Sequence, residues 1–197
     1  MSKRTWPMLI GFILISLLAG AIGSIFTISA IPAWYATLSK PSFSPPNWVF
    51  GPVWTILYIL MGIAAYLVWI KGQEIKEKIS GMGKAAREKI SKAAKAKANL
   101  KGSKKSGMKA AKGILNVNFA LKVFGFQLIL NALWSILFFG LRSPLYGFLC
   151  IIPLWLSIAW TIKLFWQIDR RAAYLLVPYI AWVSFASVLN YFVFVMN

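Results

Sequence analysis

The side chains of this chain that could do chemistry are aromatic rings and neutral amides. They recur at helical spacing in three uncharged segments, as Trp54 and Tyr58, as Gln127, Asn131 and Trp134, and as Trp182 with Tyr179 and Asn190 beside it. An amide inside lipid is costly without a partner, so these faces should point into a bundle of helices. Rings stack on flat ligands, while an amide can hold a carbonyl or amide group. The pattern predicts an uncharged cleft for a planar, largely apolar ligand, although packing between helices explains it equally well.

Other kinds of chemistry have few residues to support them. The chain has no histidine and one cysteine, Cys150, so the usual ligands of a zinc or two-metal site are missing. The long apolar segments contain no acid, which argues against a proton relay across a membrane. We therefore expect no metal and no cofactor, and no acid–base catalysis.

Apolar segments of membrane-spanning length dominate the chain. Hydrophobic residues make up 59% of the 197 residues, and only 13% are charged. A helix needs about 20 apolar residues to cross the hydrocarbon core of a bilayer. Five uncharged segments approach or exceed that length, at 6–28, 48–70, 123–141, 144–162 and 172–196. They predict an all-α membrane protein, a five-transmembrane-helix bundle.

Basic residues lie almost entirely on one side of these five spans. Lys3, Arg4, the 71–122 connection and the 163–171 connection share that side, whereas the other side holds only Lys40 and Arg142. The positive-inside rule then predicts a multi-pass protein of a prokaryotic cell membrane, with a cytoplasmic N-terminus and an external C-terminus.

One domain, 1–197, is expected, with a lysine-rich cytoplasmic insertion at about 72–115 between spans two and three. Ile75, Ile79, Met82 and Ile90 follow helical spacing within it, and lysines fill the remaining face. This pattern predicts an amphipathic helix on an anionic leaflet of membrane lipids. A solvated loop is equally compatible. Nucleic acid is a weaker alternative, and we expect none, because the segment lacks aromatic residues that stack on bases.

Prolines mark the external connection and three of the spans. Pro41, Pro45 and Pro46 should stiffen the loop 29–47, which would cover the mouth of the cleft as a lid. Pro52, Pro153 and Pro178 should kink spans two, four and five. Span one carries the small residues Ser16, Gly20 and Ser24 at four-residue spacing, which favours close packing within the bundle or across a dimer.

Three blocks of sequence resemble the translocator protein family (TspO/MBR, also called the peripheral-type benzodiazepine receptor family). They are KPSFSPPNWVFGPVWTILYILMG, LNALWSILFFG and AAYLLVPYIAWVSFASVLNYFV, in that order. The resemblance covers all five spans and omits about residues 72–115. It implies a five-helix bundle, often a homodimer, with a ligand cleft toward the loop between spans one and two.

The resemblance also implies ligands and site residues. Members bind porphyrins such as protoporphyrin IX, sterols in some eukaryotes, and benzodiazepine or isoquinoline drugs. Some bacterial members are reported to degrade protoporphyrin in light through two tryptophans, which match Trp54 and Trp182. Other cleft positions match Tyr35, Asn131, Trp134, Tyr146 and Cys150.

Two departures from the family pattern stand out. The family's connection between spans two and three is short, so the lysine-rich insertion takes no family role. The sterol-recognition pattern is incomplete, because Tyr191 is followed only by FVFVMN. Leu60, Tyr66 and Lys71 satisfy that loose pattern only by spacing.

Together these features favour an integral membrane binding protein for porphyrins or related flat apolar molecules, acting as sensor, regulator or carrier. Its ligand-binding residues would be Tyr35, Trp54, Tyr58, Gln127, Asn131, Trp134, Tyr146, Cys150 and Trp182, with Gln127 and Asn131 as polar anchors. The alternatives are an enzyme that degrades porphyrin with light and oxygen, using Trp54 and Trp182 as catalytic residues, and a transporter of tetrapyrroles or sterols.

Overall fold

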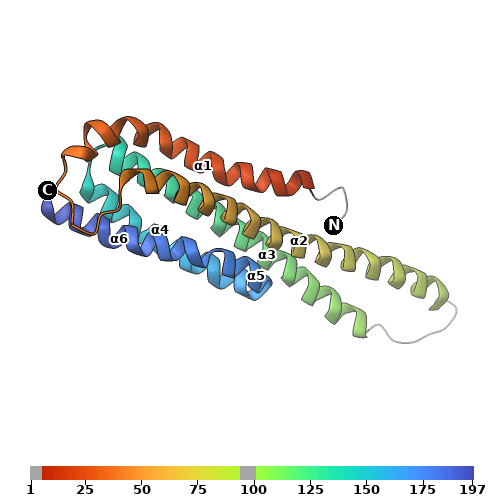
Figure 1. Cartoon of the computed structure of the whole chain (residues 1–197). Helices are drawn as coiled ribbons and strands as arrows, with labels where there is room; N and C mark the ends of the chain where they lie inside the picture. The colour runs from red at the N-terminus through yellow and green to blue at the C-terminus, as the bar shows by residue number, and fades with distance from the viewer. Residues whose placement is uncertain (1–5, 94–100) are drawn as a thin grey trace.

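A computed structural model describes residues 6–93 and 101–197, without the side chains of residues 79, 82–112, 114 and 115. Its described residues form helices and connecting turns, with no strand among them (Figure 1). The helices are α1 (Trp6–Ala33), η1 (Tyr35–Thr37), α2 (Asn47–Ala93), α3 (Lys101–Ser135), η2 (Ile136–Gly140), α4 (Pro144–Ile168), α5 (Arg170–Leu175) and α6 (Val177–Met196). Five described helical segments are long and apolar enough to cross a membrane, as the uncharged runs predict. The protein is an integral, multi-pass membrane protein.

Local sequence explains where the last helices begin. The Ser143 side chain accepts a hydrogen bond from the Tyr146 N–H at 3.3 Å, and Pro144 fills the first turn of α4, where no donor is needed. Asp169 caps α5 by accepting from the Arg171 N–H at 2.9 Å. The fifth span therefore consists of α5 and α6, and Pro178 stands in the first turn of α6 rather than inside a kinked helix.

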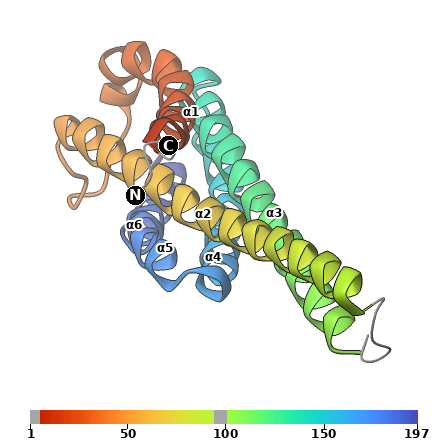
Figure 2. The same ribbon diagram turned by 90° about the vertical axis from the view of Figure 1, so that its right-hand side faces the viewer.

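The helices pack as a bundle in which small residues allow close approach (Figure 2). A Cβ at Gly62 of α2 would lie 2.5 Å from the Cα of Ile13 in α1, so the two backbones touch there. Gly20 of α1 leaves room for the ring of Tyr58, and Ser16 is fully buried. The predicted small-residue stripe of α1 therefore packs at least partly within the bundle.

A five-residue π-helix, η2, ends the third span. Its wider turn places Phe138 and Phe139 next to each other, with ring centroids 4.8 Å apart and both rings against Tyr35. The chain then reverses at Arg142, whose φ of 51° lies in the left-handed region. This end of the bundle is therefore closed by aromatic rings.

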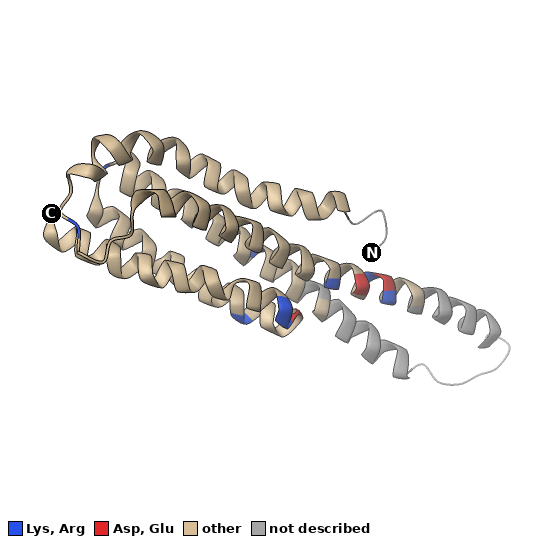
Figure 3. Ribbon diagram, viewed as in Figure 1, with Lys and Arg blue, Asp and Glu red and all other residues tan. Residues whose placement is uncertain are grey.

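The lysine-rich connection continues two of the spans. The backbone of α2 continues without a break from the second span to Ala93, and α3 returns from Lys101 (Figure 1). At 1.5 Å per residue, the 47 residues of α2 extend about 70 Å, more than twice the hydrocarbon thickness. The described part of the insertion is thus an extension of two spans beyond the bundle. Residues 94–100 of the predicted insertion lie outside the described residues, and its contact with an anionic leaflet stays a prediction. Most of the described charged side chains lie toward that end (Figure 3).

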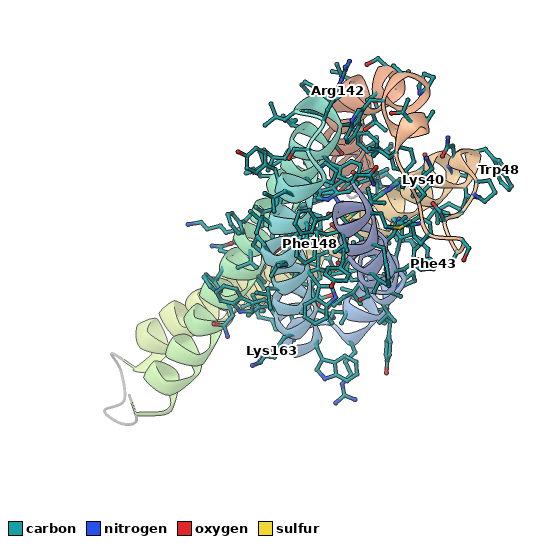
Figure 4. The ribbon with its side chains drawn as sticks, turned by 90° about the vertical axis from the view of Figure 1, so that its left-hand side faces the viewer. Lys40, Phe43, Trp48, Arg142, Phe148 and Lys163 are labelled. Carbon is teal, nitrogen blue, oxygen red and sulfur yellow. The ribbon has the colours of Figure 1, made fainter. Side chains whose placement is uncertain are left out.

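The connection between α1 and α2 is fastened by specific contacts. The Lys40 ammonium donates to the carbonyls of Tyr35 and Leu38 at 2.8 and 2.9 Å. The Asn197 side chain accepts from the Ser39 N–H and donates to its carbonyl, at 3.0 and 2.9 Å. Figure 4 shows this connection running beside the end of α6. It is therefore held at both the α1 end and the α6 end.

Candidate functional site

A cavity of about 560 Å³ lies between α1, α2, α3 and α6, on the side of the bundle that carries the α1–α2 connection. Helix α6 packs closely against α4. Its approach to α2 is made by large side chains, such as Phe50 on Trp182 with centroids 5.8 Å apart. Because these large rings keep the backbones of α2 and α6 apart, a cavity of small-molecule size remains between the helices.

Aromatic rings form the walls of the cavity. Trp54 stacks on Tyr58 with centroids 5.6 Å apart and meets the edge of Tyr179 at 6.2 Å. Across the cavity, Trp134 stacks on Phe138 at 5.3 Å. Each tryptophan ring is therefore held by a neighbouring ring, which fixes the shape of the wall.

A buried hydrogen-bond network closes the inner end of the cavity. The Tyr58 hydroxyl donates to Oδ1 of Asn131, and Nδ2 of Asn131 donates to the Tyr179 hydroxyl at 2.9 Å. Tyr179 in turn donates to Oε1 of Gln127 at 2.9 Å, and Nε2 of Gln127 faces the sulfur of Met61 at 3.8 Å. These hydrogen bonds join α2, α3 and α6, and they use both the oxygen and the nitrogen of the Asn131 amide.

The cavity opens sideways between two neighbouring spans. Its exposed lining residues all belong to α1 and α2, namely Ala21, Ile28, Asn47, Trp48, Gly51 and Thr55. Trp48 is 75% exposed and projects away from the bundle (Figure 4). The segment 29–47, expected as a lid, meets the cavity only in part. Its Ile31, Tyr35 and Asn47 line the cavity. Its Phe43 instead packs on Phe185 and Phe192 of α6.

The structure brings six of the predicted site residues to this cavity: Tyr35, Trp54, Tyr58, Asn131, Trp134 and Trp182. It does not bring the other three there. Gln127 is 1% exposed and lies behind Tyr179, beneath the inner end. Tyr146 is 51% exposed, and the Cys150 thiol faces the Leu130 carbonyl, because α4 packs behind α3 and α6 and contributes nothing to the lining.

The sequence-based site also lacked one polar residue of the wall. Asn190 of α6 lines the cavity together with Trp182, Ala186, Leu189 and Val193. Helical spacing already set Asn190 beside the face of Trp182, although it was not chosen as a site residue, and the structure places it in the wall.

Comparisons with known proteins agree with this architecture. The model of the TspO/MBR family matches residues 12–196. The chain belongs to the TspO/MBR family. It is similar to tryptophan-rich protein TspO of Archaeoglobus fulgidus, 35% identical over 96% of both chains. It is also similar to tryptophan-rich protein TspO of Chlorobaculum tepidum, 37% identical over 92% of this chain and 90% of that one. The human translocator protein is 32% identical over 94% of this chain and 88% of its own length.

Proposed function

We propose that this TspO/MBR protein binds porphyrins such as protoporphyrin IX, or related flat apolar molecules, and acts as a sensor, regulator or carrier. The observation that carries the proposal is the cavity itself. Four tryptophans line it, Trp48 at the mouth and Trp54, Trp134 and Trp182 in the wall, and no charged side chain does so among the described residues. Such a wall suits a planar ring system that stacks on indoles and displaces little bound water.

The mouth supports the same class of ligand. Ala21 and Thr55 lie within the first and second spans, so the opening between them faces the bilayer. An apolar molecule dissolved in lipid could reach the tryptophans without passing through water. A highly charged molecule would have to leave its hydration shell to take the same path.

Fluorescence titration in lipid nanodiscs tests the proposal. Protoporphyrin IX should quench tryptophan emission saturably, and the Trp54→Ala, Trp182→Ala double variant should bind it at least about tenfold more weakly, because two stacking surfaces are lost. A matched control is the Trp6→Ala, Trp160→Ala double variant, since both of these rings are exposed and neither lines the cavity. Equal losses in the two double variants would contradict the proposed site.

The predicted topology belongs to this proposal. We expect the N-terminus in the cytoplasm of a prokaryotic cell, so that the extension of α2 and α3 lies on the cytoplasmic side and the α1–α2 connection outside. The homodimer that the family resemblance implies stays a prediction. Accessibility of single cysteines introduced at Ser39 and Lys76, in a Cys150→Ser background, would establish the orientation.

A light-dependent enzyme is the second candidate. It is favoured by the position of Trp54, which borders the cavity and stacks on Tyr58, because an oxidisable indole would lie against a bound porphyrin. Dioxygen would be the oxidant and illuminated porphyrin the substrate. Porphyrin absorbance should then fall faster with the protein than with a Trp54→Phe, Trp182→Phe variant at equal occupancy. Equal rates would leave binding as the function.

A further inference from the structure

Two exposed aromatic rings and an arginine meet where α4 is followed by α5, far from the cavity lining. The rings of Trp166 and Tyr174 contact edge to face, with centroids 5.3 Å apart, and these residues are 42% and 60% exposed. The guanidinium carbon of Arg170 lies 5.2 Å from the centroid of the Trp166 ring. Tyr174 therefore supports the indole, and the indole holds the exposed arginine by a cation–π contact.

A second exposed cation, Lys163, stands close to the same indole. It precedes Trp166 by three residues on α4, so the two side chains are neighbours on one helical face (Figure 4). Lys163 and Arg170 thus lie on either side of Trp166 along the chain. We refer to Lys163, Trp166, Arg170 and Tyr174 as the α4–α5 corner.

The carboxylates next to this corner already have cationic partners. Arg171 donates to both side-chain oxygens of Asp169, at 2.9 and 3.2 Å, and Asp169 is buried. Glu74 of α2 accepts from Lys71 at 2.9 Å. Among the described residues, no ion pair involves either cation of the corner. The corner therefore presents two positive charges that suit an anion from outside the chain.

The position of the corner favours a lipid as the source of that anion. The fourth span ends at Ile168 and the fifth begins at Arg170, so the corner lies at the boundary between hydrocarbon and water. Exposed tryptophan and tyrosine prefer the level of the lipid headgroups. A phospholipid offers a phosphate to the cations and acyl chains to the rings, whereas a dissolved phosphate would use only the cations.

We propose that the α4–α5 corner binds the headgroup of an anionic phospholipid, with its phosphate between Lys163 and Arg170 and its acyl chains along Trp166. A zwitterionic headgroup fits less well, because its own ammonium group competes for the phosphate and is repelled by the two cations. This site is separate from the cavity and from the leaflet contact predicted for the lysine-rich insertion.

Native mass spectrometry of the protein in micelles tests the proposal with two lipids of the same acyl chains. The first phosphatidylglycerol should bind the wild type at least about tenfold more tightly than the first phosphatidylcholine, because each cation near an anionic headgroup strengthens binding about fivefold. The double variant Lys163→Gln, Arg170→Gln should bind both lipids about equally. Both positions are exposed, so its unfolding temperature in zwitterionic micelles should match that of the wild type.

Two further variants separate a built site from attraction by net charge. Lys76→Gln, Lys78→Gln removes the same charge at exposed positions in the extension of α2, and it should keep the full preference for phosphatidylglycerol. Trp166→Leu keeps both cations of the corner but removes the ring that holds Arg170. It should weaken phosphatidylglycerol binding by about two- to fivefold.

Each remaining outcome would overturn the proposal. Equal binding of the two lipids to the wild type does so without any variant. Equal losses in the two double variants would mean that net charge, and not the corner, attracts the lipid. Displacement of phosphatidylglycerol by millimolar glycerol 1-phosphate would identify a site for dissolved phosphates instead. An unchanged affinity in Trp166→Leu would refute the role of the ring.

Discussion

Replacing Gly62 by alanine tests the packing that brings α1 and α2 together. The added Cβ would lie 2.5, 2.8 and 2.9 Å from the Cα and N of Ile13 and the carbonyl oxygen of Phe12. All three are backbone atoms, which cannot swing aside as a side chain could. Ordinary contact begins at 3.4 Å, so the helices must separate by about 0.9 Å, the difference between 3.4 and 2.5 Å.

We expect this separation to cost about 1–2 kcal/mol of unfolding free energy, because overpacking costs about 1–3 kcal/mol and the better helix propensity of alanine returns part of it. Denaturant titration in mixed micelles measures the change. The matched control is Gly125→Ala, since a Cβ at Gly125 meets nothing within 4 Å and should leave stability unchanged or slightly raised. If the two variants were equally stable, the backbones of α1 and α2 would not be in contact at Gly62.

Three further predictions concern the ends of the bundle. The hydrogen bond from Arg171, with its charge, holds the pKa of Asp169 below its ordinary value of 3.8. At neutral pH the wild type should therefore be more stable than Asp169→Asn, a variant that keeps a capping side chain. Thermal unfolding should show that this difference in stability disappears as the pH falls below about 4. Arg142→Gly should raise the unfolding free energy by up to about 1 kcal/mol, because glycine adopts a φ of 51° without strain, and a lower melting temperature would contradict this. Asn197→Ala should accelerate hydrogen exchange of the Ser39 amide, whose acceptor it removes, and an unchanged exchange rate would show that the side chain does not hold the connection.

Much of the fold follows from where charges are absent. Hydrocarbon excludes ionised groups, so the five uncharged runs mark the spans. Most span ends in the structure lie within a few residues of the ends of these runs. Helical periodicity also placed Trp54, Asn131 and Trp182 on faces that meet, because in lipid polar and aromatic faces turn toward protein.

The sequence could not predict how deep a residue lies in the bundle or which helices pack against each other. Gln127 shares a helical face with Asn131 but lies one turn deeper, where Tyr179 occupies the space. Tyr146 and Cys150 came from the family resemblance, and only the packing order of the helices shows that α4 stands behind the cavity. The π-helical turn at Phe138 likewise has no signal in apolar periodicity, since it adds one residue to a turn without changing residue type.

The proposed route through the sideways opening between α1 and α2 would fix the reservoir from which a guest is drawn. On that route, a molecule at Ala21 or Thr55 exchanges with the acyl chains, so its partition coefficient would set the concentration the protein experiences. Doubling the lipid at a constant amount of guest dilutes that reservoir and raises the apparent dissociation constant, with no change in any contact. Affinities for this protein are comparable only when they are expressed as mole fractions of guest in lipid.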